Sequence, residues 1–197
     1  MFVANVSPLK RPVFFLKKSV KERAMCGMEF EFEETVLQSL EYSDEFSSSD
    51  QQRLLEIFDH ANRRLHGFLE NKLLAYQKDE MAITLFPIAS FIIARVGNEI
   101  AGFASYFDNH LIGIFISENF SHCSLEQRLL DKVKQTLDRE LETIVFMKNS
   151  SWLELYLEDG FNISACRSCW RCNEIMVTLV HDGCESFTTS FIAQAHM

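Results

Sequence analysis

The segment from residue 90 to residue 117, SFIIARVGNEIAGFASYFDNHLIGIFIS, constrains the fold more than any other part of this sequence. Its apolar runs are separated by Gly97-Asn98 and by Asp108-Asn109. Such pairs form two-residue hairpin turns, because glycine, asparagine and aspartate tolerate positive φ angles. The segment therefore predicts three antiparallel strands that follow one another in a sheet.

Before this segment, the sequence predicts strand structure and then an amphipathic helix. Apolar and polar residues alternate over part of residues 28–42, which is typical of one or two strands. Ser49 and Gln52 have the spacing of a capping box, and apolar residues recur after them at helical intervals. This helix is expected to extend, with a break near Gly67, to about Lys78.

Two further helices are predicted after the three strands. Ser124 and Gln127 have capping-box spacing and open the first of them. Its apolar stripe comprises Leu125, Leu129, Val133, Leu137 and Leu141. Ser151 and Glu154 open the second, and Gly160 ends it, since glycine is favoured just past a helix C-terminus.

The order of these elements predicts the fold class. Further strands are expected at residues 143–147 and within residues 161–180. Together the elements indicate an α+β fold with a mixed, mostly antiparallel central sheet flanked by helices, in which one crossover makes a parallel pair. Residues 28–197 are expected to form a single domain, and residues 1–27 a basic N-terminal extension.

Charge and composition argue against several classes of protein. The net charge of −9 does not suit a nucleic-acid-binding protein, because binding phosphates requires a surplus of cations. No apolar run approaches the roughly 18 residues of a membrane span. Six cysteines and no recognisable secretion signal favour reduced thiols. We therefore expect a cytoplasmic protein that binds neither nucleic acid nor membrane.

A second informative segment, NSSWLELYLEDGF, spans residues 149–161. It resembles the pattern that commonly ends the last helix in the GNAT superfamily of N-acyltransferases, Asn-x-x-Ala-x-x-(Phe/Leu)-Tyr-x-x-x-Gly-Phe. The positions that match are Asn149, Leu155, Tyr156, Gly160 and Phe161. Trp152 replaces the alanine. The order of predicted elements is similar too, and the resemblance covers roughly residues 50–180.

Residues 116–130, ISENFSHCSLEQRLL, are similar to the acyl-CoA loop of the same superfamily. Ile116, Phe120 and the pair Leu129-Leu130 stand at its apolar positions. The residues that depart from its usual pattern are Ser121, His122, Ser124 and Glu126. Glycine lets the backbone approach a pyrophosphate closely, whereas an acidic side chain repels it. This departure supports an alternative in which the fold has lost CoA binding.

The resemblance implies an N-acetyltransferase that transfers an acetyl or other acyl group from acetyl-CoA (acyl-CoA) to an amine acceptor, either a small molecule or a protein amino group. It implies that Tyr156 acts as the acid that protonates the departing thiolate. The residues implied to bind the cofactor are Ile114, Phe115, Ile116, Ser121, His122, Cys123, Ser124, Leu125, Glu126, Gln127, Asn149, Trp152 and Tyr156. A homodimer through the final strands is also implied. The alternative is a catalytically inactive GNAT-like binding or regulatory module.

The general base is not given by the resemblance. The strand LIGIFIS lacks the glutamate that several GNAT relatives keep there. Glu118, just past that strand, is the first candidate for the base, and His110 and Asp108 follow it. A chain of water molecules is a further alternative.

The cysteines raise the question of a metal site. Cys166, Cys169 and Cys172 have a C-x-x-C-x-x-C spacing, which is found in zinc and iron–sulfur proteins. In an extended strand Cys169 would point away from the other two, so we expect no metal. A small metal or redox protein is the third alternative. Cys123 lies near a helix start, where the dipole can lower a thiol pKa, although an inert buried thiol is the competing interpretation.

Overall fold

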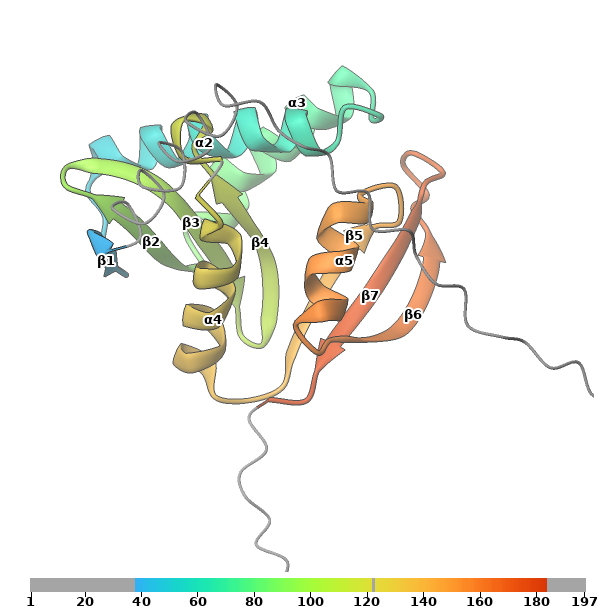
Figure 1. The fold of residues 1–197 in the computed structure, drawn as a ribbon. Coiled ribbons are helices and arrows are strands. Elements are labelled where there is room, and N and C mark those ends of the chain that lie inside the picture. The colour runs from blue at the N-terminus through green and yellow to red at the C-terminus, as the bar shows by residue number, and fades with distance from the viewer. Residues whose placement is uncertain (1–37, 122, 184–197) are drawn as a thin grey trace, which may run out of the picture. The chain divides into compact units, whose positions relative to one another are not determined.

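Seven strands form one sheet, in the order β1-β2-β3-β4-β5-β7-β6, in the computed structural model, which describes residues 38–121 and 123–183 (Figure 1). Neighbouring strands are antiparallel except β4 and β5, which are parallel because α4 crosses over between them. The predicted α+β fold with a mixed, mostly antiparallel sheet is confirmed. The predicted basic extension, residues 1–27, lies outside the described residues.

The strands are β1 (Leu40–Ser43), β2 (Ser90–Val96), β3 (Glu99–Phe107), β4 (His110–Ile116), β5 (Leu141–Phe146), β6 (Asn162–Ser168) and β7 (Ile175–His181). The helices are α2 (Ser48–Leu65), α3 (Asn71–Glu80), α4 (Leu125–Leu137) and α5 (Ser150–Glu158), with a π-helical turn at Met81–Leu85 and a 3₁₀ helix at Glu118–Phe120. In the ranges that the structure describes, no helix has both the length and the apolar character needed to cross a bilayer.

The three-stranded meander is confirmed as β2, β3 and β4. Its turns contain Gly97 and Asp108, whose φ angles are 60° and 54°. Alternate residues along the strands enter two different cores. Phe91 packs with residues of α2, whereas its neighbour Ile92 belongs to the core beneath α4 and α5. Because helices cover both faces of these strands, their sequences are almost continuously apolar.

The start of α2 differs from the prediction. Ser47, not Ser49, is the N-cap, and its side chain accepts a hydrogen bond from the backbone N–H of Asp50, which reciprocates. Ser49 lies inside the helix, and the Gln52 side chain donates to a glutamate one turn later. The predicted break near Gly67 is confirmed, because α2 ends just before it and α3 begins just after it.

The start and the end of α4 also differ from the prediction. Ser124 is the N-cap residue, but its φ of 46° is left-handed and its side chain caps nothing. Gln127 instead donates to Asp159, at 2.6 Å. Asp138, with a φ of 45°, ends the helix, so Leu141 is the first residue of β5 and not the last of the helical stripe.

The predicted cap of α5 is wrong, and its predicted end is confirmed. Asn149 is the N-cap residue, and neither Ser151 nor Glu154 caps the helix, since both lie within it. Gly160 ends it with a φ of 95°. The N–H of Phe161 then donates to the carbonyl of Tyr156 at 3.0 Å, which fixes Phe161 against that helix.

Candidate functional site

The site begins where β4 and β5 separate. The two strands pair only at His110 with Glu142 and at Leu111 with Thr143, and then diverge (Figure 1). On its other side β4 has a bulge, because Leu111 lies opposite Tyr106 and the next paired residue is Gly113. A bulge bends a strand and increases its local twist. Within residues 38–121 and 123–183, the edge of β4 that faces β5 has no strand partner beyond Leu111.

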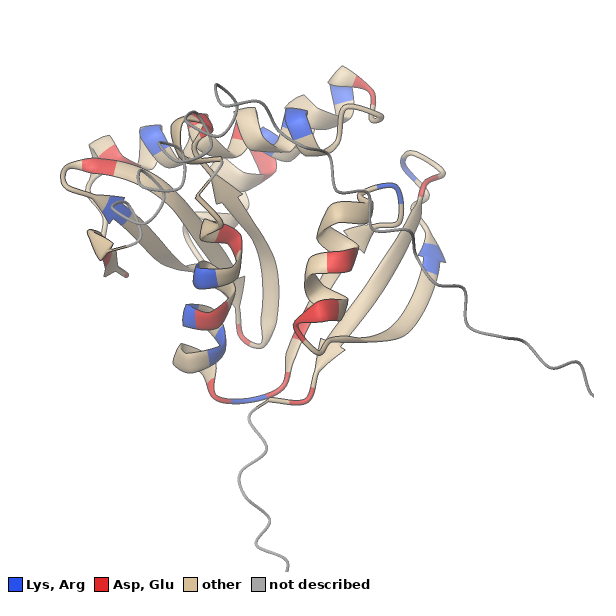
Figure 2. Ribbon diagram, viewed as in Figure 1, with Lys and Arg blue, Asp and Glu red and all other residues tan. Residues whose placement is uncertain are grey.

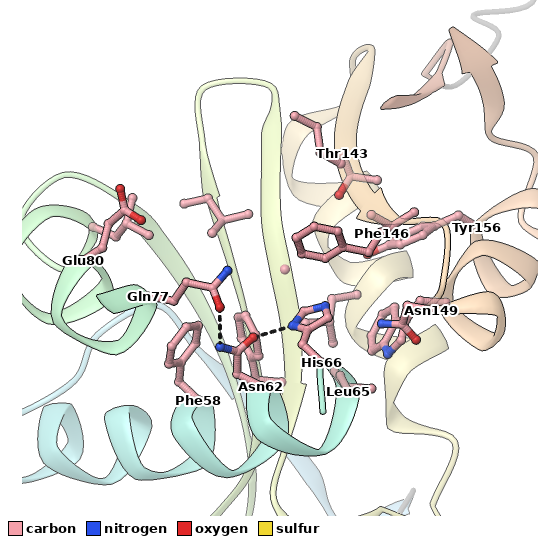
Figure 3. Close-up of a pocket in the computed structure, with 18 residues that line it drawn as sticks. Phe58, Asn62, Leu65, His66, Gln77, Glu80, Thr143, Phe146, Asn149 and Tyr156 are labelled. Carbon is pink, nitrogen blue, oxygen red and sulfur yellow. Dashed lines mark hydrogen bonds between the residues drawn. The ribbon is translucent and has the colours of Figure 1, made fainter. Parts of the chain in front are cut away.

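A cavity of about 220 Å³ occupies the opening between β4 and β5 (Figure 3). Its walls come from α2, α3, β4, β5 and α5. Of the predicted site residues, those that line it are Ile114, Phe115, Asn149, Trp152 and Tyr156. The structure thus brings the motif of α5 together with the strand predicted to hold the acyl arm.

Tyr156 is buried in this cavity wall, with 2% of its surface exposed. Its ring packs between those of Trp152 and Phe161, at centroid distances of 5.7 Å and 5.1 Å. Burial raises the pKa of Tyr156, and the charge of Asp159 adds to the rise, while a hydrogen bond with Thr143 acts in the opposite direction. The phenol therefore stays protonated at neutral pH and can serve as a donor but not as a base.

Asn149 lines this cavity, and Trp152 lies between it and a second one. The Asn149 side chain caps no backbone group, although its amide oxygen accepts from Ser151 at 3.4 Å. Trp152 lines both the first cavity and a neighbouring hollow of about 250 Å³ between α4 and α5. The other residues that line the hollow are Ser124, Glu126, Gln127, Ser151 and Leu155.

The residues before α4 that were predicted to bind the cofactor lie in different surroundings. Cys123 and Leu125 are buried in the core, with 1% and 0% exposed, so their side chains face away from the hollow. Ser121 donates its hydroxyl to the carbonyl of Glu118 at 2.9 Å. The prediction for His122 falls outside the described residues. Ile116 is also buried in the core and pairs with β3.

Glu126 lies in the first turn of α4, at the hollow. Burial raises the pKa of Glu126, whereas a hydrogen bond from its own backbone N–H and the charge of Arg64 act to lower it. The acidic side chain thus occupies a helix N–H that an incoming anion would use. Figure 2 shows that acidic residues are present on both of the helices that enclose this hollow, α4 and α5.

The candidate bases lie away from the cavity. Glu118 lines a different hollow, and its side chain is 73% exposed and lies 3.3 Å from His60 Nε2. His110 pairs with a glutamate of β5, also at 3.3 Å, at the end where the strands meet. Asp108 forms an ion pair with Arg139 at 2.8 Å. The structure therefore does not bring Glu118, His110 or Asp108 together with Tyr156.

The cavity contains a polar network that the sequence interpretation missed (Figure 3). Asn62 is 3% exposed and donates its amide to Gln77 Oε1 at 2.9 Å. The amide oxygen of Asn62 therefore accepts from His66 Nδ1, 2.6 Å away. This arrangement leaves a lone pair on His66 Nε2. Burial lowers the pKa of His66 from 6.5 to about 4, so the imidazole is neutral at pH 7.

The sequence carries a signal for this network. Phe58, Asn62 and His66 are spaced four residues apart, so two polar residues continue the stripe that the apolar residues of α2 begin. A polar pair on the buried face of an amphipathic helix requires partners, and here the pair finds them in the cavity. His66 also contacts the ring of Phe146 on β5, at a centroid distance of 5.2 Å.

Comparison with solved structures identifies the fold. A GCN5-related N-acetyltransferase from Rhodopseudomonas palustris has a TM-score of 0.56 and 13% identity, covering 73% of this chain and 94% of that chain. PaiA N-acetyltransferase from Thermoplasma acidophilum, in complex with CoA, has a TM-score of 0.58 and 16% identity, covering 71% and 98%. Spermidine N-acetyltransferase from Vibrio cholerae, in complex with CoA and spermine, has a TM-score of 0.55 and 11% identity, covering 74% and 96%.

The chain therefore has the GNAT fold that the sequence resemblance implied. No protein-family model matches the sequence, and a search of curated proteins finds no match. As for metals, residues 38–121 and 123–183 contain no group of three or more His, Cys, Asp or Glu side chains placed to hold an ion.

Proposed function

We propose that this protein is an N-acetyltransferase that transfers an acyl group from acyl-CoA to an amine. The observation that carries the proposal is the position of Tyr156, a buried and protonated phenol in the wall of the cavity between β4 and β5. The fold supports it, and the structural neighbours from Thermoplasma and Vibrio were solved with CoA. The homodimer and the cytoplasmic location expected from the sequence stay predictions.

The two cavities, which share Trp152 in their walls, offer neighbouring sites for the acyl-CoA. The hollow at the start of α4 would take the pyrophosphate, because helix N-termini attract anions. The pantetheine arm would run past Trp152 and along the free edge of β4, near Ile114 and Phe115, where it can pair like an added strand. This placement brings the thioester to Asn149 and Tyr156.

The residues of the cavity fit the chemistry of acyl transfer. The amine nitrogen attacks the thioester carbonyl carbon, and the carbon–sulfur bond then breaks. Tyr156, which its raised pKa keeps protonated, donates its proton to the departing thiolate and then regains a proton from water. His66 Nε2 accepts a hydrogen bond from the attacking amine and orients its lone pair. With a pKa of about 4, His66 does not retain the proton of the amine, which passes to water.

Glu80 supports an amine as the acceptor. Glu80 lines the cavity and makes no ion pair within the part of the chain that the structure describes. A carboxylate here attracts the protonated form of an amine and raises its local concentration. The Vibrio neighbour is a spermidine N-acetyltransferase solved with spermine, which is a polyamine.

One observation favours the alternative, an inactive module that has lost CoA binding. Glu126 presents an acidic group at the hollow where the pyrophosphate would lie, and it already accepts a hydrogen bond from its own N–H. A negative charge at this point opposes an anionic ligand. The affinity for CoA therefore distinguishes the two functions.

Replacing Glu126 by glutamine should tighten acetyl-CoA binding by about five- to tenfold, which corresponds to roughly 1 kcal/mol of removed repulsion. The measurement is calorimetric titration of the wild-type chain and of Glu126→Gln with acetyl-CoA at low salt. Because the pKa of Glu126 is raised, its carboxylate loses charge as the pH falls toward that pKa. The difference in affinity between the two proteins should shrink accordingly.

Glu154→Gln is the matched control for charge, because Glu154 is exposed on α5 and does not line the hollow. It should leave the dissociation constant within about twofold of that of the wild type. If neither the wild type nor Glu126→Gln binds acetyl-CoA at concentrations up to about 1 mM, the acyltransferase proposal is wrong, and the inactive module is the function that remains.

A further inference from the structure

The segment between β6 and β7 is a turn, so Cys169 and Cys172 do not lie in the extended strand that was assumed for them from the sequence. The N–H of Cys172 donates to the carbonyl of Cys169 at 3.3 Å, and the N–H of Asn173 donates to the same carbonyl at 2.7 Å. Asn173 has a φ of 57°, in the left-handed region. The turn forms here because asparagine tolerates that region, and the chain then reverses into β7.

This turn brings two thiols into contact. A turn closed by a bond between residues i and i+3 places their Cα atoms within about 7 Å, which includes the range that a disulfide requires. Each thiol is close enough to affect the pKa of the other, lowering that of Cys169 and raising that of Cys172, and both side chains are partly exposed. Both are free thiols. The backbone spacing of the turn therefore permits a disulfide between these two free thiols.

The surroundings of the turn give the two thiols different pKa values. Partial burial acts to raise the pKa of Cys169. Hydrogen bonds from the N–H groups of Arg171 and Cys172, and the Cys172 thiol, lower it by more, so the net effect is a lowered pKa. Burial raises the pKa of Cys172, and the neighbouring Cys169 adds to the rise. Cys169 is accordingly the nucleophile, and Cys172 is the thiol that resolves the intermediate.

Two cysteines are enough to form a disulfide but are too few ligands for a structural zinc ion. Zinc takes four ligands, and the described residues place no third His, Cys, Asp or Glu beside these two sulfurs. Cys166, the remaining cysteine of the motif, belongs to β6 and is exposed. Disulfide formation needs only the two sulfurs that the turn brings together.

The turn contacts the acceptor side of the main cavity. The Arg171 guanidinium stacks on the ring of Tyr76 of α3, 4.4 Å from its centroid, and donates to the Tyr76 hydroxyl at 3.2 Å. Cys169 and Arg171 line a hollow of about 180 Å³ together with Gln77 and Glu80. Gln77 and Glu80 also line the main cavity, so the turn lies next to residues of that cavity.

We propose that Cys169 and Cys172 are a site of reversible modification, at which a small-molecule disulfide oxidises the pair to an intramolecular disulfide. The Cys169 thiolate attacks one sulfur of the oxidant, and the other sulfur leaves as a thiolate. The Cys172 thiolate then attacks the Cys169 sulfur and releases the second small thiol. The two protein thiols lose two electrons and two protons, and the oxidant is reduced to two thiols. The inference does not depend on acyltransferase activity.

The test uses the full chain equilibrated with mixtures of oxidised and reduced glutathione, then alkylated and digested with trypsin and a glutamate-specific protease. Cleavage after Arg167, Arg171 and Glu174 places Cys169 and Cys172 on separate peptides and also separates them from Cys184. We expect residues 168–171 and 172–174 to remain linked in oxidised samples, with two fewer thiols open to alkylation. Reduction should release both peptides.

Single variants test the assigned roles. Cys172→Ser should retain one glutathione on Cys169, because no thiol is left to displace it. In Cys169→Ser, glutathione should add to Cys172 about tenfold more slowly than it adds to Cys169 in Cys172→Ser, because the more acidic thiol is lost. Cys166→Ser is the matched control and should behave like the wild type. Unlinked peptides at every glutathione ratio, a disulfide between two chains, or a zinc ion found on both thiols by native mass spectrometry would each overturn the proposal.

Discussion

Tyr156→Phe should lower kcat for acyl transfer by about a hundredfold or more, the range of effects expected when a positioned acid is removed. The substitution deletes only the hydroxyl, so the ring contacts with Trp152 and Phe161 are kept. In Tyr156→Phe this residue no longer has a proton to donate to the departing thiolate, so the leaving group is less stabilised. The measurement is the steady-state rate with acetyl-CoA and a polyamine such as spermidine.

Affinity and stability separate this chemical role from a structural one. Acetyl-CoA should bind Tyr156→Phe within about twofold of the wild type, because the hydroxyl acts on the departing sulfur and not on the bound ground state. Thr143→Val removes the partner of the hydroxyl but keeps the donor, so its kcat should fall less than that of Tyr156→Phe. An unchanged kcat in Tyr156→Phe would show that the phenol only packs the wall.

Local turn chemistry made the central part of this fold predictable. Gly97-Asn98 and Asp108-Asn109 mark the turns of the meander, and both turns contain a residue at positive φ. The motif from Asn149 to Phe161 was also readable, because its glycine ends a helix in the conformation that glycine favours. In these stretches, short-range sequence patterns and the tertiary structure agree.

Capping was predicted less well, because similar polar residues compete over a few positions. The run of serines before α2 offers several N-caps, and Asp50 decides the choice by bonding back to Ser47 while forming an ion pair with Arg95 of β2. Gln127 likewise bonds to Asp159, 32 residues away, and not to Ser124. Tertiary partners of this kind cannot be inferred from spacing alone.

The acceptor side of the site was the least predictable part. Glu118 was selected as the base because it follows β4 directly, but the structure places it in an exposed 3₁₀ helix that lines a different hollow. The network of Asn62, His66 and Gln77 joins two helices and faces a strand far along the chain, so it becomes apparent only once the elements are packed.

His66 should make the stability of this protein depend on pH. The pKa of His66 is about 4 in the folded protein and near 6.5 in the unfolded chain. Above pH 6.5 the imidazole is neutral in both states and contributes no pH dependence. As the pH falls from 6.5 to 4, only the unfolded chain gains the proton, so the free energy of unfolding should decrease by roughly 3 kcal/mol. Below pH 4 both states are protonated and the loss is complete.

Urea denaturation of the wild type and of His66→Gln at a series of pH values measures this contribution. Glutamine can still donate to Asn62, but it lacks the ring that contacts Phe146, so the variant should be less stable than the wild type at pH 7. Because glutamine does not titrate, the variant should lose less stability on acidification. His60→Gln is the matched control, because His60 lies on the same helix with 53% of its side chain exposed and pairs with Glu118. A difference between the wild type and His66→Gln that stays constant from pH 7 to pH 4 would mean that the imidazole accepts a proton in the folded protein. With an unshifted pKa, His66 would be basic enough to retain the proton of the amine, and its proposed role of orienting the acceptor without retaining that proton would then be wrong.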